Sequence, residues 1–198
     1  MDTALNKISE AGKEIVNINN KFTFNQNIKI GNPIGNLYRL SHVLVLVKTF
    51  DGKYVLGKKI GFYPSHIARF IGGGVDKGEN FINAAVRELK EELKVERDIS
   101  ELVHLIEVNT VADTNEGIMK MTTNVYLCRL NEGDEYSAND DVSDLLIINQ
   151  TEFKELINSM DMLDSEYITD KFSFKWSDWA KIYGPIHRVA LEVEMKIG

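Results

Sequence analysis

Three acidic side chains, Glu88, Glu91 and Glu92, are spaced so that an α-helix would place them close together on one face. Like charges at positions i, i+3 and i+4 of a helix repel one another, by roughly 0.2–0.5 kcal/mol per pair when exposed. A hard divalent cation would relieve this repulsion, because Mg²⁺ and Mn²⁺ prefer carboxylate and water oxygens and often bind through one or two carboxylates together with substrate phosphates. The spacing is therefore typical of a metal site, or of a solvated charged face on which Arg87 pairs with Glu91.

The segment that carries these glutamates has the apolar pattern of a helix. Over residues 81–93, apolar side chains recur at i, i+3, i+4, i+7 and i+11, a stripe formed by Ile82, Ala85, Val86, Leu89 and Leu93. Such a stripe anchors a helix on a core, and it lies roughly a third of a turn away from the glutamates. We therefore expect one helix that has an apolar side on the core and an acidic side beside it.

The residues before this helix complete a longer pattern. Gly73 is followed after five residues by Glu79, and after seven more by the run Arg-Glu-Leu-Lys-Glu-Glu-Leu-Lys-Val at 87–95. This pattern resembles the Nudix box, with eight of its nine specified positions present. The departure is Lys94, where the family has a glycine that ends the helix in a left-handed conformation. We expect Lys94 to end the helix differently, as a cation suited to a helix C-terminus.

The Nudix resemblance implies a role for each matching position. Glu88, Glu91 and Glu92 would hold Mg²⁺ or Mn²⁺, with a backbone carbonyl of Gly72 or Gly73 near the same ion. Glu91 or Glu92 could also act as a general base on water, while Arg87 and Glu79 would pair and orient the ligands. A further base could come from outside the box, and the candidates are Glu116, Asp134, Glu135, Asp140 and Asp141.

The substrate side of the site is predicted in the segment before the glycines. Residues 57–70 contain no acid, and their cations Lys58, Lys59 and Arg69 are candidates for binding phosphates, with Arg69 favoured because it stands three residues before the glycines. Phe62, Tyr63 and Phe70 either stack on a base or fill the core.

Composition narrows the classes of partner. The 198 residues carry a net charge of −7, but residues 131–166 hold eleven acids against one base, Lys154. The acidity argues against binding of duplex nucleic acid, whose phosphate backbone attracts Lys and Arg, but not against a metal-bound nucleotide. A single cysteine, Cys128, predicts a reducing, cytoplasmic location. The aliphatic run 43–47 is far too short to span a membrane, and no secretory signal is visible.

The remaining pattern predicts strands mixed with a few helices. Strands are expected at 22–30, 41–49, 54–58, 103–111, 121–130 and 145–149, with a hairpin turn at Asp51-Gly52. A helix should begin near Thr151 as N-cap and run to 158, and residues 176–197 predict a helix followed by a strand or a second helix. The first 20 residues could start as a short helix carrying Ala4, Leu5, Ile8, Ala11 and Ile15.

These elements predict an α/β (α+β) fold, and the resemblance implies a Nudix-like α/β/α sandwich with a mixed β-sheet. Residues 37–159 would form the Nudix domain, 1–36 an N-terminal extension and 160–198 a C-terminal extension packed on the same domain. In the family, such extensions often make dimer contacts or a substrate lid, so a homodimer is possible.

The resemblance implies a metal-dependent hydrolase of a small phosphorylated substrate. We expect cleavage of a phosphoanhydride bond in a nucleoside diphosphate linked to another moiety, such as an ADP-ribose-like or dinucleotide substrate. Two alternatives stay open: a nucleoside triphosphate pyrophosphatase that clears modified nucleotides, and a non-catalytic module that senses a nucleotide. The intact glutamates argue against the sensor, and no cysteine-centred motif supports an isopentenyl diphosphate isomerase.

Overall fold

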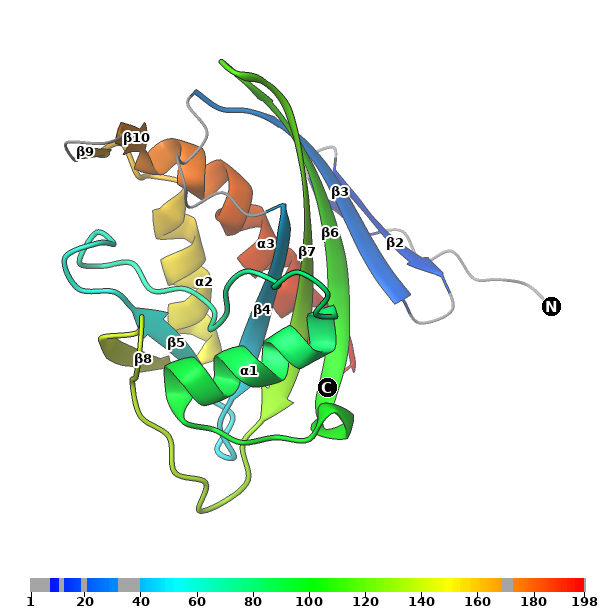
Figure 1. Cartoon of the computed structure of the whole chain (residues 1–198), viewed down its shortest axis with the longest axis vertical. Helices are drawn as coiled ribbons and strands as arrows, with labels where there is room; N and C mark the ends of the chain where they lie inside the picture. Colours follow the sequence, from blue (N-terminus) through cyan, green and yellow to red (C-terminus); the bar gives the residue numbers. More distant parts are fainter. Residues whose placement is uncertain (1–7, 11–12, 19–20, 32–39, 169–172, 198) are drawn as a thin grey trace.

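A single eight-stranded mixed sheet runs through the protein (Figure 1). The computed structural model describes residues 8–10, 13–18, 21–31, 40–168 and 173–197. In chain order the strands are β1 (Ile8–Glu10), β2 (Lys13–Ile18), β3 (Lys21–Lys29), β4 (Ser41–Lys48), β5 (Tyr54–Lys58), β6 (Leu102–Thr114), β7 (Gly117–Arg129) and β8 (Asp144–Ile148). Their order in the sheet is β1-β2-β3-β6-β7-β4-β5-β8. Only the pairs β3–β6 and β4–β7 are parallel within the described strands, which confirms the predicted mixed sheet.

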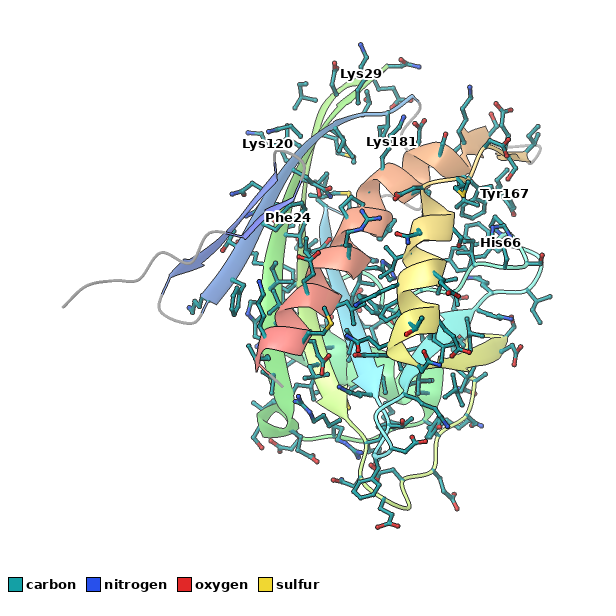
Figure 2. The ribbon with its side chains drawn as sticks, turned by 180° about the vertical axis from the view of Figure 1, so that it is seen from behind. Phe24, Lys29, His66, Lys120, Tyr167 and Lys181 are labelled. Atoms are coloured by element: carbon teal, nitrogen blue, oxygen red, sulfur yellow. The ribbon has the colours of Figure 1, made fainter. Side chains whose placement is uncertain are left out.

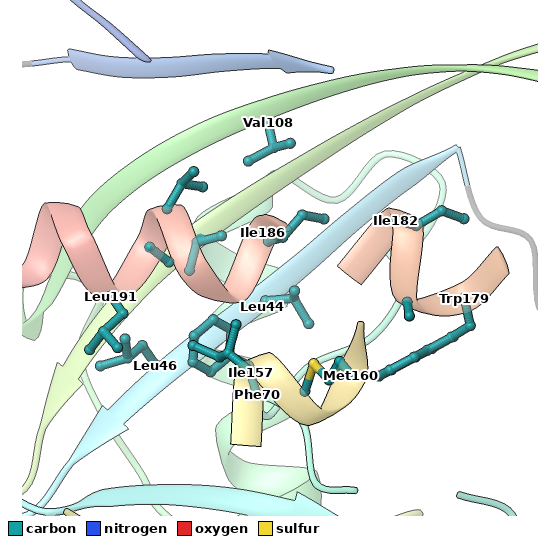
Figure 3. Packing of buried hydrophobic residues seen from close by; sticks show 14 of the residues in the cluster. Leu44, Leu46, Phe70, Val108, Ile157, Met160, Trp179, Ile182, Ile186 and Leu191 are labelled. Atoms are coloured by element: carbon teal, nitrogen blue, oxygen red, sulfur yellow. The ribbon is translucent and has the colours of Figure 1, made fainter. Parts of the chain in front are cut away.

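Helices cover both faces of the sheet. Helix α1 (Phe81–Leu93) lies on one face, whereas α2 (Gln150–Met160) and α3 (Trp176–Ile197) lie side by side on the other, as Figure 2 shows from behind. Strand β4 is buried on both sides because successive side chains of a strand point to opposite faces. Leu44 and Leu46 join the core beneath α2 and α3 (Figure 3), while alternate valines of β4 pack under α1.

The long hairpin β6–β7 extends further than the apolar pattern predicted. The two strands pair from Leu102 opposite Cys128 to Thr114 opposite Gly117, with a bulge between His104 and Ile106. Residues 112–120, which separate the two expected strands, therefore belong mostly to the strands themselves. Their side chains need no buried partner because this end of the hairpin is largely exposed.

The N-terminal segment is extended, so the expected short helix is wrong where the structure describes it. Ile8 and Ile15 lie opposite each other in the pair β1–β2, and β2 pairs with β3. Pairing with β3 supplies backbone hydrogen bonds to a segment whose apolar spacing is only loosely helical. Ala4, Leu5 and Ala11 lie outside the described residues.

The C-terminal segment contains a hairpin and one long helix. Strands β9 (Glu166–Ile168) and β10 (Ser173–Lys175) pair outside the main sheet and lead into α3. Pro185 lies inside α3, and a proline removes a backbone hydrogen bond from the helix. The Gln26 side chain of β3 donates to the nearby Ile182 carbonyl at 3.2 Å and to the Thr110 hydroxyl at 2.7 Å. The helix nevertheless continues past its proline to Ile197, and Gln26 links it to β3.

Two helix ends differ from the sequence expectations. The N-cap of α2 is Asn149 instead of Thr151, because the Asn149 side chain accepts from the Thr151 and Glu152 amides. Lys94 ends α1 in the left-handed conformation, with φ 58° and ψ 23°, so it does what the family's glycine does. The expectation of a different ending is therefore wrong. Within the described residues, no helix combines the length and apolar character needed to cross a membrane.

Candidate functional site

A cavity of about 410 Å³ lies beside α1. Two parts of the connection between β5 and α1 bound it: the loop directly after β5 (59–70) and the glycine loop (71–74). The acidic loop between β7 and β8 (130–143) and the first turns of α3 complete the boundary. Its lining residues are His42, Lys59, Phe62, Tyr63, Arg69, Gly72, Gly73, Gly74, Asp76, Arg87, Glu88, Glu91, Glu92, Asp140, Asp141, Trp179 and Tyr183. The cavity therefore brings together most of the residues that the sequence singled out.

The glycine loop is held against β4 by backbone hydrogen bonds. The Val45 amide donates to the Ile71 carbonyl at 2.7 Å, and the Val43 amide donates to the Gly73 carbonyl at 2.9 Å. Gly72 has φ +139°, and a Cβ there would lie 2.2 Å from the Val43 carbonyl oxygen. Only glycine fits this position, and its close approach to β4 fixes the loop over the acidic side of α1.

Two of the three glutamates point under this loop. The Glu92 side chain is 3% exposed, and its Oε2 accepts from the Gly72 amide at 2.8 Å. The Glu88 carboxylate occupies space that a side chain at Gly73 would fill, since a Cβ there would lie 2.6 Å from Glu88 Oε1. Glu91 is exposed. The expected separation of acidic and apolar sides thus holds only in part, because Glu88 and Glu92 are buried.

Burial raises the pKa of both inner glutamates. For Glu88, the loss of solvent is the main cause and the charge of Glu92 adds to it, while Arg87 opposes the shift. For Glu92, burial again raises the pKa, opposed first by the Arg69 guanidinium and then by the Gly72 amide. Positive charge nearby therefore opposes the effect of burial and favours the ionised form of these carboxylates.

Arg87 connects four parts of the site. Its guanidinium makes two hydrogen bonds of 3.0 Å to Glu79, which lower the pKa of that carboxyl. The same group donates to Glu88 Oε1 at 2.8 Å, to Glu91 Oε2 at 2.9 Å and to the Gly74 carbonyl at 2.9 Å. Arg87 thus ties α1 to the glycine loop.

The donor set suits a hard divalent cation. Nη1 of Arg87 already lies between the carboxylates of Glu88 and Glu91, so these two side chains can share one positive group. Among the described residues no three acidic, histidine or cysteine side chains converge in a ready-made metal cluster. Oxygen donors next to a glycine cradle are nevertheless the ligands that Mg²⁺ and Mn²⁺ prefer. The Gly73 carbonyl has one lone pair in its bond to Val43 and could offer the other.

The three predicted phosphate-binding cations have different surroundings. Arg69 lines the cavity, but its Nη2 lies 3.3 Å from Glu92 Oε1. Lys59 also lines the cavity and forms an ion pair of 2.7 Å with Asp141. Lys58 lines a separate cavity of about 270 Å³ beside the loop that follows β5.

The candidate bases outside the box also separate in space. Asp140 and Asp141 line the main cavity. Asp134 pairs with Arg97, and Glu116 lies in the turn between β6 and β7. The acidic loop also covers the end of α1, where the Asn139 amide donates to the Glu92 carbonyl and the Asn139 side chain donates to the Glu91 carbonyl. The loop therefore positions two of the four acids that the sequence proposed in it.

Sequence reasoning missed the contribution of α3. Trp179 and Tyr183 line the cavity together with His42 of β4, and Phe62 and Tyr63 complete the aromatic side. The spacing of Trp179 and Tyr183, at i and i+4, indicates a shared helix face, but nothing in the sequence places that face opposite α1. Only the packing of α3 on the sheet reveals it.

Comparisons with known proteins agree with this architecture. The model of one family, described as the NUDIX domain, matches residues 38–163. A search of curated proteins finds no significant match. An Ap4A hydrolase from C. elegans is 16% identical, with 80% of this chain and 96% of that chain covered and a TM-score of 0.51.

Two further solved structures are similar. A NUDIX hydrolase from Nitrosomonas europaea is 13% identical, with 80% of this chain and 90% of that chain covered and a TM-score of 0.52. A MutT/nudix family protein from Enterococcus faecalis is 20% identical, with 56% of this chain covered and a TM-score of 0.46. In that case the chain spans 43% of the other protein's length.

Proposed function

The chain belongs to the Nudix hydrolase family, and on that premise we propose that it is a divalent-metal-dependent enzyme that cleaves a phosphoanhydride bond. Its substrate would be a nucleoside diphosphate linked to another moiety, such as an ADP-ribose-like molecule or a dinucleotide. One observation carries this proposal. One cavity is lined by the three glutamates of α1, by the cations Arg69 and Lys59, and by aromatic rings.

Glu88, Glu91 and Glu92 would hold Mg²⁺ or Mn²⁺, which when bound supplies charge neutralisation at the diphosphate and makes water more acidic. Glu79 keeps Arg87 in place, and Arg87 in turn orients the carboxylates of Glu88 and Glu91. Glu91 is the exposed member of the three and lines the cavity, so it is best placed to accept a proton from the attacking water. Gly73 gives the inner ligands their room.

The cations would hold the phosphate chain. Lys59 lines the cavity and forms an ion pair with the exposed Asp141, so a diphosphate can replace that carboxylate. Arg69 is already paired with Glu92 and would contact phosphate with its remaining N–H groups. A cytoplasmic location, a homodimer and the lack of affinity for duplex nucleic acid stay predictions from the sequence.

The deciding experiment is a turnover screen on a nucleotide panel, with Mg²⁺ or Mn²⁺ and with EDTA, in which the products are separated and identified by chromatography. We expect metal-dependent turnover that falls at least about a hundredfold in Glu91→Gln and in Glu92→Gln. Glu132→Gln removes an exposed acid outside the cavity and should match the unmodified protein.

The products separate the remaining possibilities. Two monophosphate products indicate a diphosphate-linked substrate, whereas pyrophosphate indicates a nucleoside triphosphate pyrophosphatase. Nucleotide binding without turnover of any panel member would contradict the enzyme proposal and favour a sensing module.

A further inference from the structure

The cavity has a carboxylate side and an aromatic side, and Arg69 lies between them. On one side its guanidinium pairs with Glu92, which is 3% exposed. On the other side are Tyr63 and Tyr183. Burial alone would lower the pKa of Arg69, but Tyr63, Glu92 and Tyr183 together raise it. Arg69 thus pairs with a carboxylate and lines the same cavity as the two tyrosines.

The aromatic side is built around Trp179 of α3. Its ring centroid lies 5.1 Å from that of Tyr183, with 30° between the ring planes, and 5.6 Å from that of Tyr63. Trp179 is 4% exposed, whereas Tyr63 and Tyr183 are half-buried. The indole thus forms the back of the wall, and the two tyrosines form its accessible front.

This wall is rigidly supported from outside the cavity. Tyr63 contacts both Trp176 and Phe62, and Phe62 packs edge-on against Tyr167 of β9. The backbone carbonyl of Tyr183 is hydrogen-bonded to Nδ1 of His187 at 2.7 Å. Nε2 of the same histidine accepts a hydrogen bond from the Phe70 amide at 3.1 Å. Trp179 and Tyr183 lie beyond residue 163, where the family match ends. Part of the wall therefore lies outside the segment that the family model matches.

We propose that Tyr183 and Tyr63, backed by Trp179, bind the planar ring of the substrate's nucleoside and thereby determine which substrates the enzyme accepts. This inference rests on the proposed function, since it assigns one end of the same substrate. A ring on the tyrosines places the attached phosphates over Arg69 and directs them to the glutamates, which is the order of groups in a nucleotide. A cavity of about 410 Å³ also lies within the usual range for small-ligand sites, roughly 300–1,000 Å³.

The chain offers its own reporter, because it contains two tryptophans, Trp176 and Trp179. In Trp176→Phe, all indole fluorescence comes from Trp179. We expect adenosine, guanosine, cytidine or uridine 5′-monophosphate, added in EDTA, to change this emission saturably, whereas ribose 5-phosphate, which lacks the ring, should not. In Trp179→Phe the remaining indole is Trp176, which does not line the cavity, and its emission should stay constant.

A second measurement uses the best substrate from the nucleotide panel. Tyr183→Ala should raise KM by about tenfold or more with kcat little changed, because base–aromatic stacking is worth roughly 1–3 kcal/mol per base. Tyr183→Phe keeps the ring and should stay within about twofold of the unmodified protein. Phe50→Ala is the control, since Phe50 is an exposed aromatic ring outside the cavity lining.

The two proposals fail in different ways. If ribose 5-phosphate changes Trp179 emission as much as the nucleotides do, or if no nucleotide changes it, the ring site is wrong even when turnover is observed. An unchanged KM in Tyr183→Ala would overturn it as well. The fluorescence titration needs neither metal nor hydrolysis, so a ring-dependent signal without turnover would support the ring site and reject only the proposed reaction.

Discussion

Arg69 forms an ion pair with Glu92 at the inner end of the cavity, with 3.3 Å between Nη2 and Oε1. The second oxygen of Glu92 accepts the Gly72 amide, so both oxygens of this buried carboxylate have partners. The sequence suggested Arg69 as a phosphate ligand. The structure gives it a second role, because its charge opposes the effect of burial on the pKa of Glu92.

Replacing Arg69 should therefore damage both stability and activity. Arg69→Gln leaves Glu92 buried without its counter-ion, and losing one partner of a buried pair typically costs about 3–5 kcal/mol. We expect a loss of about 3 kcal/mol in the free energy of unfolding, measured by urea denaturation. Lys59→Gln breaks the exposed pair with Asp141 and should cost less than about 1 kcal/mol. Equal losses in the two variants would contradict this account.

Gly73 and Gly72 should respond differently to alanine. In Gly73→Ala the added methyl group collides with the Glu88 carboxylate, which is the end of a flexible side chain. The fold should persist while turnover falls about tenfold or more, because Glu88, a proposed metal ligand, has moved. In Gly72→Ala the methyl group collides with the β4 backbone at a φ of +139°, so unfolding should follow. Circular dichroism with activity assays distinguishes the two, and an active Gly73→Ala enzyme would argue against the glycine cradle.

Lys94→Gly should stabilise the protein. A non-glycine residue in the left-handed conformation costs about 1–2 kcal/mol, part of which glycine loses again through its greater freedom in the unfolded chain. We expect a net gain of about 0.5–1 kcal/mol in urea denaturation. The matched control is Lys90→Gly, because Lys90 lies inside the same helix and glycine there should cost about 1 kcal/mol. Destabilisation by both changes would show that the Lys94 side chain matters more than its φ angle.

His187 should make the protein less stable in mild acid. Burial lowers its pKa to about 4, although the Tyr183 carbonyl opposes the shift. Below the ordinary pKa of about 6.5 the unfolded chain binds a proton that the folded chain does not. Stability is therefore lost as the pH falls from about 6.5 to about 4, by about 3 kcal/mol in total from this residue.

The measurement for His187 is a difference between two proteins. Urea denaturation of the unmodified chain and of His187→Gln at several pH values between 7 and 4 should show a flatter pH dependence in the variant. The carboxylates with raised pKa, such as Glu88, are present in both proteins and cancel in the comparison. If the free energy of unfolding of the two proteins depended on pH in the same way, the pKa of His187 would be the same in the folded and unfolded chains, which would contradict this prediction.

The apolar spacing along residues 81–93 was enough to predict α1. The features that could not be predicted from the sequence depend on packing between segments that are distant in the chain. The apolar stripe of residues 81–93 marks a helix with the observed bounds, because its periodicity reports one face buried on a core. The burial of Glu88 and Glu92 depends on a loop from elsewhere in the chain, and the left-handed Lys94 contradicts the usual preference for glycine. The N-terminal strands form through pairing with β3, which no local pattern encodes.

Helix α3 serves the core and the cavity at once. Ile182 and Ile186 are buried under the sheet, Tyr183 faces the cavity, and the Tyr183 carbonyl bonds to Nδ1 of His187 at 2.7 Å. Through Phe70, that histidine holds the chain just before the glycine loop. Changes that reshape the proposed ring-binding wall therefore also disturb the packing that supports the glycine loop beside the three glutamates. Substrate range and thermal tolerance in this protein should evolve together, so a variant selected for a new substrate will need compensating changes in the core.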